Sequence, residues 1–204
     1  MKIIGLTGPT GAGKSTLCEK FEQLGIPCVN TDDIYHSITS FSSPCVKELQ
    51  EEFGDEIIDE RGALDRPNLA KIVFTGENSQ ENLKKLNDIA HKYVWEETNK
   101  ILTQHINRGK KMAVIDAPAL FSSKVFIGAC HLIISVLCDE ETRIQRVMAR
   151  DNISREQVLA RASAQPSNEF FIKNSDYCIT NCGDKEDMIT QLYSIFEQEG
   201  IHLK

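Results

Sequence analysis

The sequence predicts an α/β fold: a mostly parallel, five-stranded sheet flanked by helices, with a helical insertion and an arginine-rich helical lid. Three observations support this expectation. Short apolar runs rich in Val and Ile alternate with stretches of helical periodicity. The runs show little polar alternation, which is typical of strands covered on both faces. The length of 204 residues suits one globular domain with insertions.

The strands are expected at five apolar runs: Lys2–Thr7, Pro27–Asn30, Met112–Ile115, Leu132–Leu137 and Tyr177–Thr180. The first run ends at Gly8, and the helix after it ends before Gly25, so the chain begins as strand, glycine loop and helix. The helix after the second strand is expected to be capped by Thr31 or Asp32, because both residue types are good N-caps.

The helices are expected where apolar residues recur at helical spacing: Ser15–Leu24, a helix beginning over Ile34–Ile38, most of 44–107, Glu140–Arg150, Ser154–Ala164 and Lys185–Gln198. Within 44–107, only Ile57 and Ile58 look extended. Residues 34–109 are therefore predicted to form a helical insertion between the second and third strands.

Composition excludes several classes of function. The 30 acidic and 23 basic side chains give a net charge of −7, the wrong sign for broad binding to nucleic acid or to anionic membranes. No apolar run approaches the roughly 18 residues that span a bilayer. The seven cysteines include no C-x-x-C pair, and Cys178 and Cys182 lie four apart without a second pair, so reduced thiols are expected rather than zinc ligands. We expect a cytoplasmic protein, a monomer or weak homo-oligomer, that acts on a small molecule.

The strongest motif is a phosphate-binding loop. Residues 8–15, GPTGAGKS, match G-x-x-x-x-G-K-[ST] between a strand and a helix, and this pattern defines a P-loop. Its glycines allow the backbone N–H groups to hold the β-phosphate at the start of the helix. Lys14 is expected to bridge the β- and γ-phosphates, and the Ser15 hydroxyl is a hard-oxygen ligand for Mg²⁺. The cofactors expected are therefore ATP and Mg²⁺.

A P-loop alone does not distinguish a kinase from a switch or a motor. The N/T-K-x-D motif of guanine switches is absent from the sequence, because residues 173–176 read KNSD, and the chain is short for a motor. A kinase needs a base for the acceptor hydroxyl. Asp32, just beyond the second strand, is the candidate, and Asp33 is its rival. The alternative is that either aspartate only caps a helix.

Arginines concentrate near the end of the chain. Residues 125–172 contain no lysine but hold five of the eight arginines: Arg143, Arg146, Arg150, Arg155 and Arg161. The first three share one helix face, and guanidinium groups suit phosphate oxygens, so a lid over the nucleotide is predicted. The alternative is a salt-bridged surface helix. We expect one kinase domain, 1–204, with a nucleotide-binding core of 1–33, 110–138 and 166–204, an acceptor-binding insertion at 34–109 and the lid at 139–165.

Four further residues have both a functional and a structural interpretation. Asp116 ends the third strand, where it would reach Mg²⁺ through water, hold the acceptor, or simply precede a turn. Asn181 would bond adenine or make a turn. Arg66 and His91 are the polar candidates in the insertion, although each is equally a helix-start or packing residue.

The whole pattern resembles the dephospho-CoA kinase family, whose members use ATP to phosphorylate the ribose 3′-hydroxyl of dephospho-CoA. The resemblance covers nearly the whole chain. Its segments are, in order, Ile4–Gly8 with Gly11–Thr16, Val29–Asp32, Gly62–Arg66, Leu86–His91, Asp116–Phe121, Arg146–Asp151 with Arg161 and Gln165, and Ser175–Tyr177 with Asn181–Gly183.

The resemblance implies a role for each matching residue. Asp32 would be the base, with Lys14 and Arg146 assisting transfer. ATP would contact the loop and three later residues: Gly11, Ala12, Gly13, Lys14, Ser15, Thr16, Arg146, Arg150 and Asn181. Dephospho-CoA would contact residues spread along the chain: Asp32, Arg66, His91, Asp116, Pro118, Leu120 and Arg161. The sequence departs from the family pattern at four places: Asn30, His36, Lys92 and Ser122–Ser123. Two alternatives are another small-molecule P-loop kinase and a nucleotide-dependent binding module without phosphoryl transfer.

Overall fold

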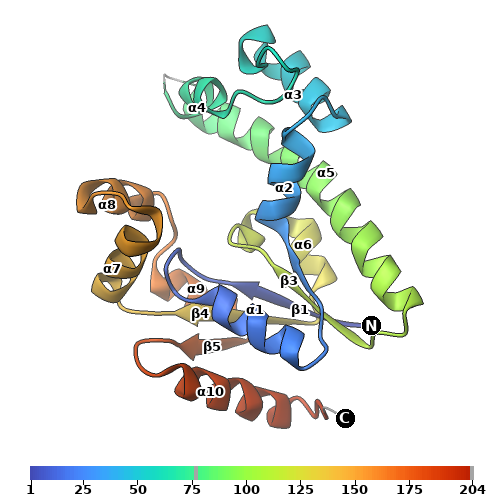
Figure 1. Ribbon diagram of the computed structural model, residues 1–204, viewed down its shortest axis with the longest axis vertical. Helices are drawn as coiled ribbons and strands as arrows, with labels where there is room; N and C mark the ends of the chain where they lie inside the picture. The colour runs from blue at the N-terminus through green and yellow to red at the C-terminus, as the bar shows by residue number, and fades with distance from the viewer. Residues whose placement is uncertain (76–77, 203–204) are drawn as a thin grey trace. The chain divides into compact units, whose positions relative to one another are not determined.

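The computed structural model describes residues 1–75 and 78–202 (Figure 1). The chain forms two compact units. The first, called here the sheet unit, comprises Met1–Val29 and His105–Lys204. The second, the helical unit, comprises Asn30–Gln104. Within the described residues, no helix is both long enough and apolar enough to cross a membrane.

The sheet has five strands in the order β2-β3-β1-β4-β5. The strands are β1 (Lys2–Thr7), β2 (Cys28–Asn30), β3 (Met112–Asp116), β4 (Leu132–Leu137) and β5 (Tyr177–Thr180). The β1–β3, β1–β4 and β4–β5 pairs are parallel. This confirms the predicted α/β fold. β2 and β3 lie on one side of the central strand β1, and β4 and β5 lie on the other. The strand order therefore reverses at β1, and ligands are expected at the carboxyl end of this strand.

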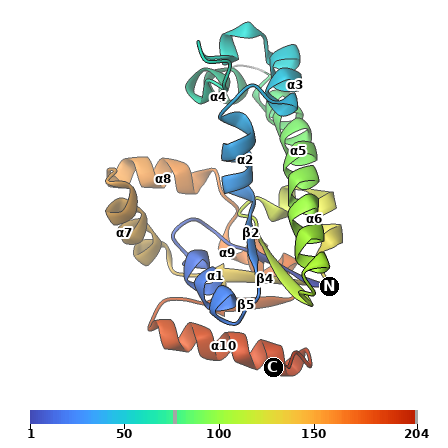
Figure 2. The ribbon, with the colours of Figure 1, turned by 45° about the vertical axis from the view of Figure 1, so that its right-hand side comes forward.

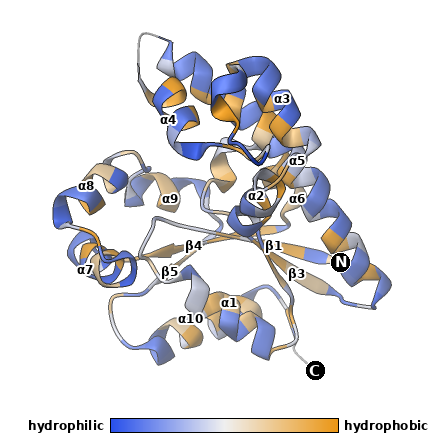
Figure 3. Ribbon diagram, turned by 45° about the horizontal axis from the view of Figure 1, so that its top comes forward, coloured by the Kyte–Doolittle hydropathy of each residue, from blue (hydrophilic) through white to orange (hydrophobic). Residues whose placement is uncertain are grey.

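Helices cover both faces of the sheet (Figure 1). α1 (Lys14–Gln23) and α10 (Lys185–Gln198) lie on one face, where Leu17, Phe21 and Leu192 pack with Ile134 of β4 in the main core. The other face carries three short elements: α6 (Lys124–Ala129), α9 (Asn168–Asn174) and the 3₁₀ turn η2 (Leu120–Ser122). Sequence periodicity did not indicate these three, because each spans no more than two turns. Apolar residues dominate the strands between these layers (Figure 3).

Two helices follow β4 and form a small core of their own. α7 (Glu140–Asp151) and α8 (Arg155–Ser163) pack through Ile144, Val147 and Val158 (Figure 2). Asp139 caps α7 by accepting from the Thr142 amide. Ser154 caps α8 in a reciprocal capping box, so this helix begins one residue later than the sequence predicts.

The helical unit contains α2 (Thr31–Thr39), α3 (Pro44–Phe53), the 3₁₀ turn η1 (Asp55–Ile57), α4 (Arg66–Phe74) and most of α5 (Ser79–Asn107). Its own apolar core includes Leu49, Leu69 and Val73. Ile57 belongs to η1 rather than to an extended segment, and Ile58 makes an isolated antiparallel bridge with Leu64.

The cap of α2 differs from the sequence prediction. Asn30, not Thr31 or Asp32, caps this helix, and its Oδ1 accepts from the backbone N–H groups of Asp32 (2.9 Å) and Asp33 (3.1 Å). The reason is that Asn30 keeps an extended backbone at the end of β2, so its short side chain reaches the first turn. As a result, the Asp32 carboxylate is not used as the cap of its own helix.

Candidate active site

The P-loop adopts a backbone that only glycine accepts at two critical positions. Gly8 has φ 133° and Gly13 has φ 103°, both in the region that L side chains avoid. A Cβ atom on Gly8 would lie 2.2 Å from the carbonyl oxygen of Val136, and one on Gly13 would lie 2.0 Å from Nδ2 of Asn181. The loop therefore fits closely against the ends of β4 and β5.

The loop leads into a helix start that is suited to an anion. Gly13 is the N-cap of α1 and makes no side-chain cap within the described part of the chain. The N–H groups of a helix's first turn and the helix dipole both favour negative charge at this end. Lys14 folds back over the loop, and its Nζ donates to the Gly8 carbonyl at 2.8 Å. Ser15 is exposed in the first turn of α1. The arrangement can bind a polyphosphate.

Residues distant in sequence hold the loop from behind. Asn181, which is buried, donates from Nδ2 to the Ala12 carbonyl at 2.7 Å. Arg146 donates from Nη1 to the Asn181 carbonyl at 3.0 Å and lies 3.5 Å from the Gly11 carbonyl. Two residues predicted to contact ATP thus brace the loop that would hold its phosphates.

Sequence reasoning gave Gln165 no role in the site, although it is part of this support. Its Oε1 accepts from the Thr10 backbone N–H at 3.0 Å. The two residues are 155 positions apart, and Gln165 follows the end of α8. The local sequence around Gln165 does not predict this contact, because the contact depends on where α7 and α8 lie relative to β1.

At the end of β3, Asp116 is only 7% exposed and lies close to the Cys18 thiol of α1. A hydrogen bond with Cys28, burial and the Asp116 charge together raise the pKa of Cys18, so this thiol is protonated at neutral pH. Beyond Asp116 the chain turns back under β1, where the Thr7 hydroxyl donates to the Pro118 carbonyl at 3.2 Å. The Leu120 side chain is fully buried, and a Cβ atom added at Gly5 would approach it to 2.7 Å.

The other lid arginines make ion pairs with acids. Arg150 and Arg161 both contact Asp151, at 2.7 and 2.9 Å, and their side chains are 61% and 56% exposed. Arg155 makes a two-pronged pair with Glu141. In the structure these three arginines therefore make surface salt bridges, as the alternative interpretation of this segment expects.

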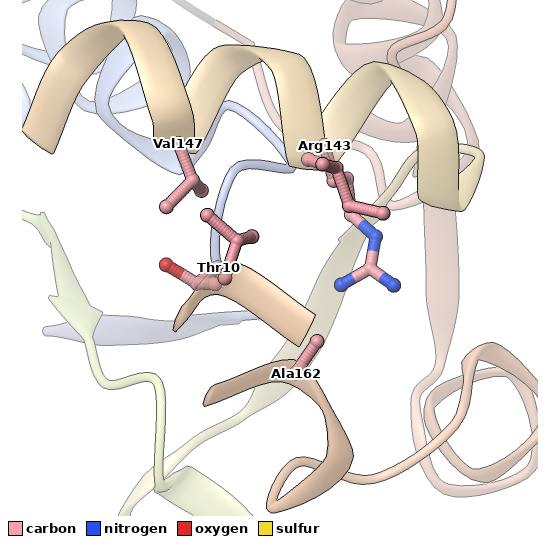
Figure 4. Close-up of a pocket in the computed structure, with 6 residues that line it drawn as sticks. Thr10, Arg143, Val147 and Ala162 are labelled. Atoms are coloured by element: carbon pink, nitrogen blue, oxygen red, sulfur yellow. The ribbon is translucent and has the colours of Figure 1, made fainter. Parts of the chain in front are cut away.

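Arg143 lines a pocket between the lid and the P-loop (Figure 4). Thr10 of the loop, Val147 of α7 and Ala162 of α8 lie on the other sides of this pocket. The buried Nε of Arg143 has no hydrogen-bond partner among the described residues. Of the lid arginines, Arg143 and Arg146 are thus the two that lie against the loop.

The helical unit holds the remaining candidates. Arg66 begins α4, and its Nη2 donates to the Thr39 hydroxyl at 2.8 Å and lies 3.4 Å from the His36 carbonyl. Arg66 is thereby tied to α2, the helix that carries the exposed Asp32 near its start. His91 lies on α5, where burial lowers the pKa of its imidazole.

The fold and this loop define a class: a P-loop nucleotide-binding protein, with the phosphate-binding loop at the central strand of a parallel sheet. A model of the dephospho-CoA kinase family matches residues 2–187. The chain therefore belongs to the dephospho-CoA kinase family, and ATP is the phosphoryl donor that this membership implies.

Individual relatives agree with this placement. A dephospho-CoA kinase from Bacillus cereus is 36% identical over 199 residues, which cover 98% of each chain. A crystal structure from Thermus thermophilus is 31% identical, covers 97% of both chains and superposes with a TM-score of 0.77. A dephospho-CoA kinase structure from Campylobacter jejuni is 23% identical over 98% of this chain, with a TM-score of 0.66, and supports the fold.

Proposed function

We propose that this protein transfers the γ-phosphoryl group of ATP to the 3′-hydroxyl of dephospho-CoA, giving coenzyme A and ADP. The main support for the proposal is the match to the dephospho-CoA kinase family over residues 2–187. In this chain the P-loop also has the backbone conformation that requires glycine at Gly8 and Gly13. A cytoplasmic location, expected from the sequence, is part of the same proposal.

The nucleotide end of the reaction is assigned to the sheet unit. The loop amides of Gly11–Thr16 would hold the β-phosphate, and Lys14 would leave the Gly8 carbonyl to meet the β- and γ-phosphates. Asn181 and Arg146 would keep the loop in place, and Arg146 would also carry positive charge toward the transferred group. Arg150 would join the phosphates only after leaving Asp151.

The residues present fit Mg²⁺. The Ser15 hydroxyl is an exposed oxygen in the first turn of α1, and hydroxyl oxygen together with water and phosphate oxygens is a donor set that this ion accepts. When bound, Mg²⁺ neutralises charge on the β- and γ-phosphate oxygens. Asp116, at the neighbouring strand end, is proposed to act through water or on the acceptor.

The acceptor end is assigned mainly to the helical unit. Asp32 would orient the ribose 3′-hydroxyl and accept its proton, which is consistent with an exposed carboxylate that does not cap its helix. Arg66 and His91 would bind the remainder of dephospho-CoA, together with Arg161 and the Pro118–Leu120 turn.

One assay tests the function against its alternatives. ADP release from Mg-ATP is measured with dephospho-CoA, with a panel of nucleosides, and without an acceptor. We expect turnover with dephospho-CoA only. Turnover with a nucleoside but not with dephospho-CoA would assign another small-molecule kinase, whereas ATP binding without any turnover would leave a binding module.

A further inference from the structure

Three metal-binding side chains meet behind the P-loop, outside the roles assigned above. Cys138 follows β4, Asp139 caps α7, and Cys182 lies two residues beyond β5. Their ligand atoms all lie within 4.8 Å of one another. The two cysteines are 44 positions apart in sequence, but β4 and β5 are neighbouring parallel strands whose ends hold them together.

The distances suit a tetrahedral thiolate site. Cys138 Sγ lies 3.6 Å from Asp139 Oδ2. With Zn–S bonds of about 2.3 Å and Zn–O bonds of about 2.0 Å at a tetrahedral angle, the sulfur and oxygen ligands would lie about 3.5 Å apart. The other oxygen, Oδ1, accepts from the Thr142 amide and so fixes the carboxylate with Oδ2 toward the sulfur. This pair therefore already has the spacing of two ligands on one zinc ion, and the third ligand atom lies within 4.8 Å of both.

Both sulfur atoms already face hydrogen-bond donors. The backbone N–H of Asp139 points at Cys182 Sγ at 3.3 Å, and Arg146 Nη1 lies 3.7 Å from Cys138 Sγ. Donors of this kind stabilise thiolates and tune metal sites. Two thiolates and one carboxylate around a divalent cation leave one negative charge, which the Arg146 guanidinium offsets. Because Asp139 and Cys182 are exposed, a fourth position faces solvent and suits a water molecule.

We propose that Cys138, Asp139 and Cys182 form a binding site for Zn²⁺, with three protein ligands. This pair of cysteines differs from the Cys178–Cys182 spacing visible in the sequence, because Cys178 lies within β5, apart from the cluster. The site adjoins Asn181 and Arg146, the two residues that hold the P-loop. Cys182 follows Asn181 directly, and Cys138 contacts Arg146. Zinc binding would therefore fix the residues that hold the nucleotide loop.

The test is a titration of the full-length protein, stripped of metal and kept reduced with a phosphine, using Co²⁺ as a spectroscopic probe and then Zn²⁺. We expect one equivalent of Co²⁺ to give thiolate-to-metal charge-transfer absorption, which Zn²⁺ then removes. A negative result in this titration would leave the proposed kinase reaction unaffected, because neither metal titration uses ATP or dephospho-CoA.

Three variants locate the ligands. Cys182→Ser, at an exposed position, should weaken Zn²⁺ binding by at least about tenfold. Asp139→Asn keeps a good helix cap but removes the charge, and should also weaken binding. Cys178→Ser is the matched control and should bind as the unaltered protein does. The proposal is overturned if the unaltered protein shows no charge-transfer band, or if Cys182→Ser and Cys178→Ser bind Zn²⁺ equally well.

Discussion

Asp32 and Asp33 are adjacent carboxylates on α2 that share one capping partner, Asn30. If Asp32 is the base, Asp32→Asn keeps the size and polarity of the side chain but removes its ability to accept a proton. We expect kcat to fall by at least about tenfold with little change in ATP affinity. Steady-state kinetics with dephospho-CoA measure this effect.

Asp33→Asn is the matched control, because it makes the same chemical change one position away. Its kcat should stay near that of the unaltered enzyme. A full kcat in Asp32→Asn, or an equal loss in both variants, would remove Asp32 from the role of base.

For Asn181, the sequence predicted the position of the residue but not the contact that its side chain makes in the structure. Its position near the nucleotide end was predicted, with adenine as its proposed partner. In the structure its Nδ2 donates to the Ala12 carbonyl at 2.7 Å. That contact spans 169 positions, so the local pattern Asn-Cys-Gly carries no trace of it.

The two roles of Asn181 make different predictions. In Asn181→Ala the Ala12 carbonyl loses its buried donor, which costs about 1–3 kcal/mol. If the residue acts by bracing the loop, the variant should lose affinity for ATP and for inorganic tripolyphosphate in the same proportion, since both engage the loop. Calorimetric titration measures both affinities. A loss confined to ATP would instead show that Asn181 recognises the base.

The arginines of α7 and α8 have two interpretations: they bind phosphate as a lid, or they form salt bridges on the surface. Arg150 shares a predicted phosphate-binding face with Arg143 and Arg146, and Arg161 is assigned to dephospho-CoA, yet Arg150 and Arg161 are both paired with Asp151. The sequence could not decide between these states, because the acids of this region provide partners as readily as a nucleotide would. There are five of them: Asp139, Glu140, Glu141, Asp151 and Glu156. Short helices such as α9 were also missed, because seven residues show too little periodicity.

Asp151→Asn tests whether this pairing competes with the nucleotide. Such exposed pairs contribute little to folding, about 0–1 kcal/mol, so the variant should unfold much as the unaltered protein does. Because the variant releases Arg150, which is assigned to the phosphates, the KM for ATP should fall. Glu141→Gln, which releases Arg155, is the comparison variant for steady-state kinetics. An unchanged KM in Asp151→Asn would mean that Arg150 does not reach ATP.

The division into two units follows from two separate apolar cores, one around Leu17 and Phe21 and one around Leu49 and Leu69. The sequence predicted the strands well, since apolar runs and glycine turns are local signals. It predicted two local details less well: α2 is capped by Asn30 rather than by Thr31 or Asp32, and Ile57 and Ile58 form a 3₁₀ turn and a single bridge with Leu64 rather than an extended segment.

Separate cores predict separable effects on the two substrates. Leu49→Ala removes a fully buried side chain from the helical unit and should cost about 2–5 kcal/mol of folding free energy. Because the P-loop contacts described above lie in the sheet unit, ATP affinity should be preserved below the unfolding temperature, while the KM for dephospho-CoA rises. Leu17→Ala makes the same change beneath the P-loop helix and should weaken ATP binding instead. Calorimetry for ATP and kinetics for dephospho-CoA distinguish the two variants. Equal loss of ATP affinity in both would mean that the helical unit also supports the nucleotide site.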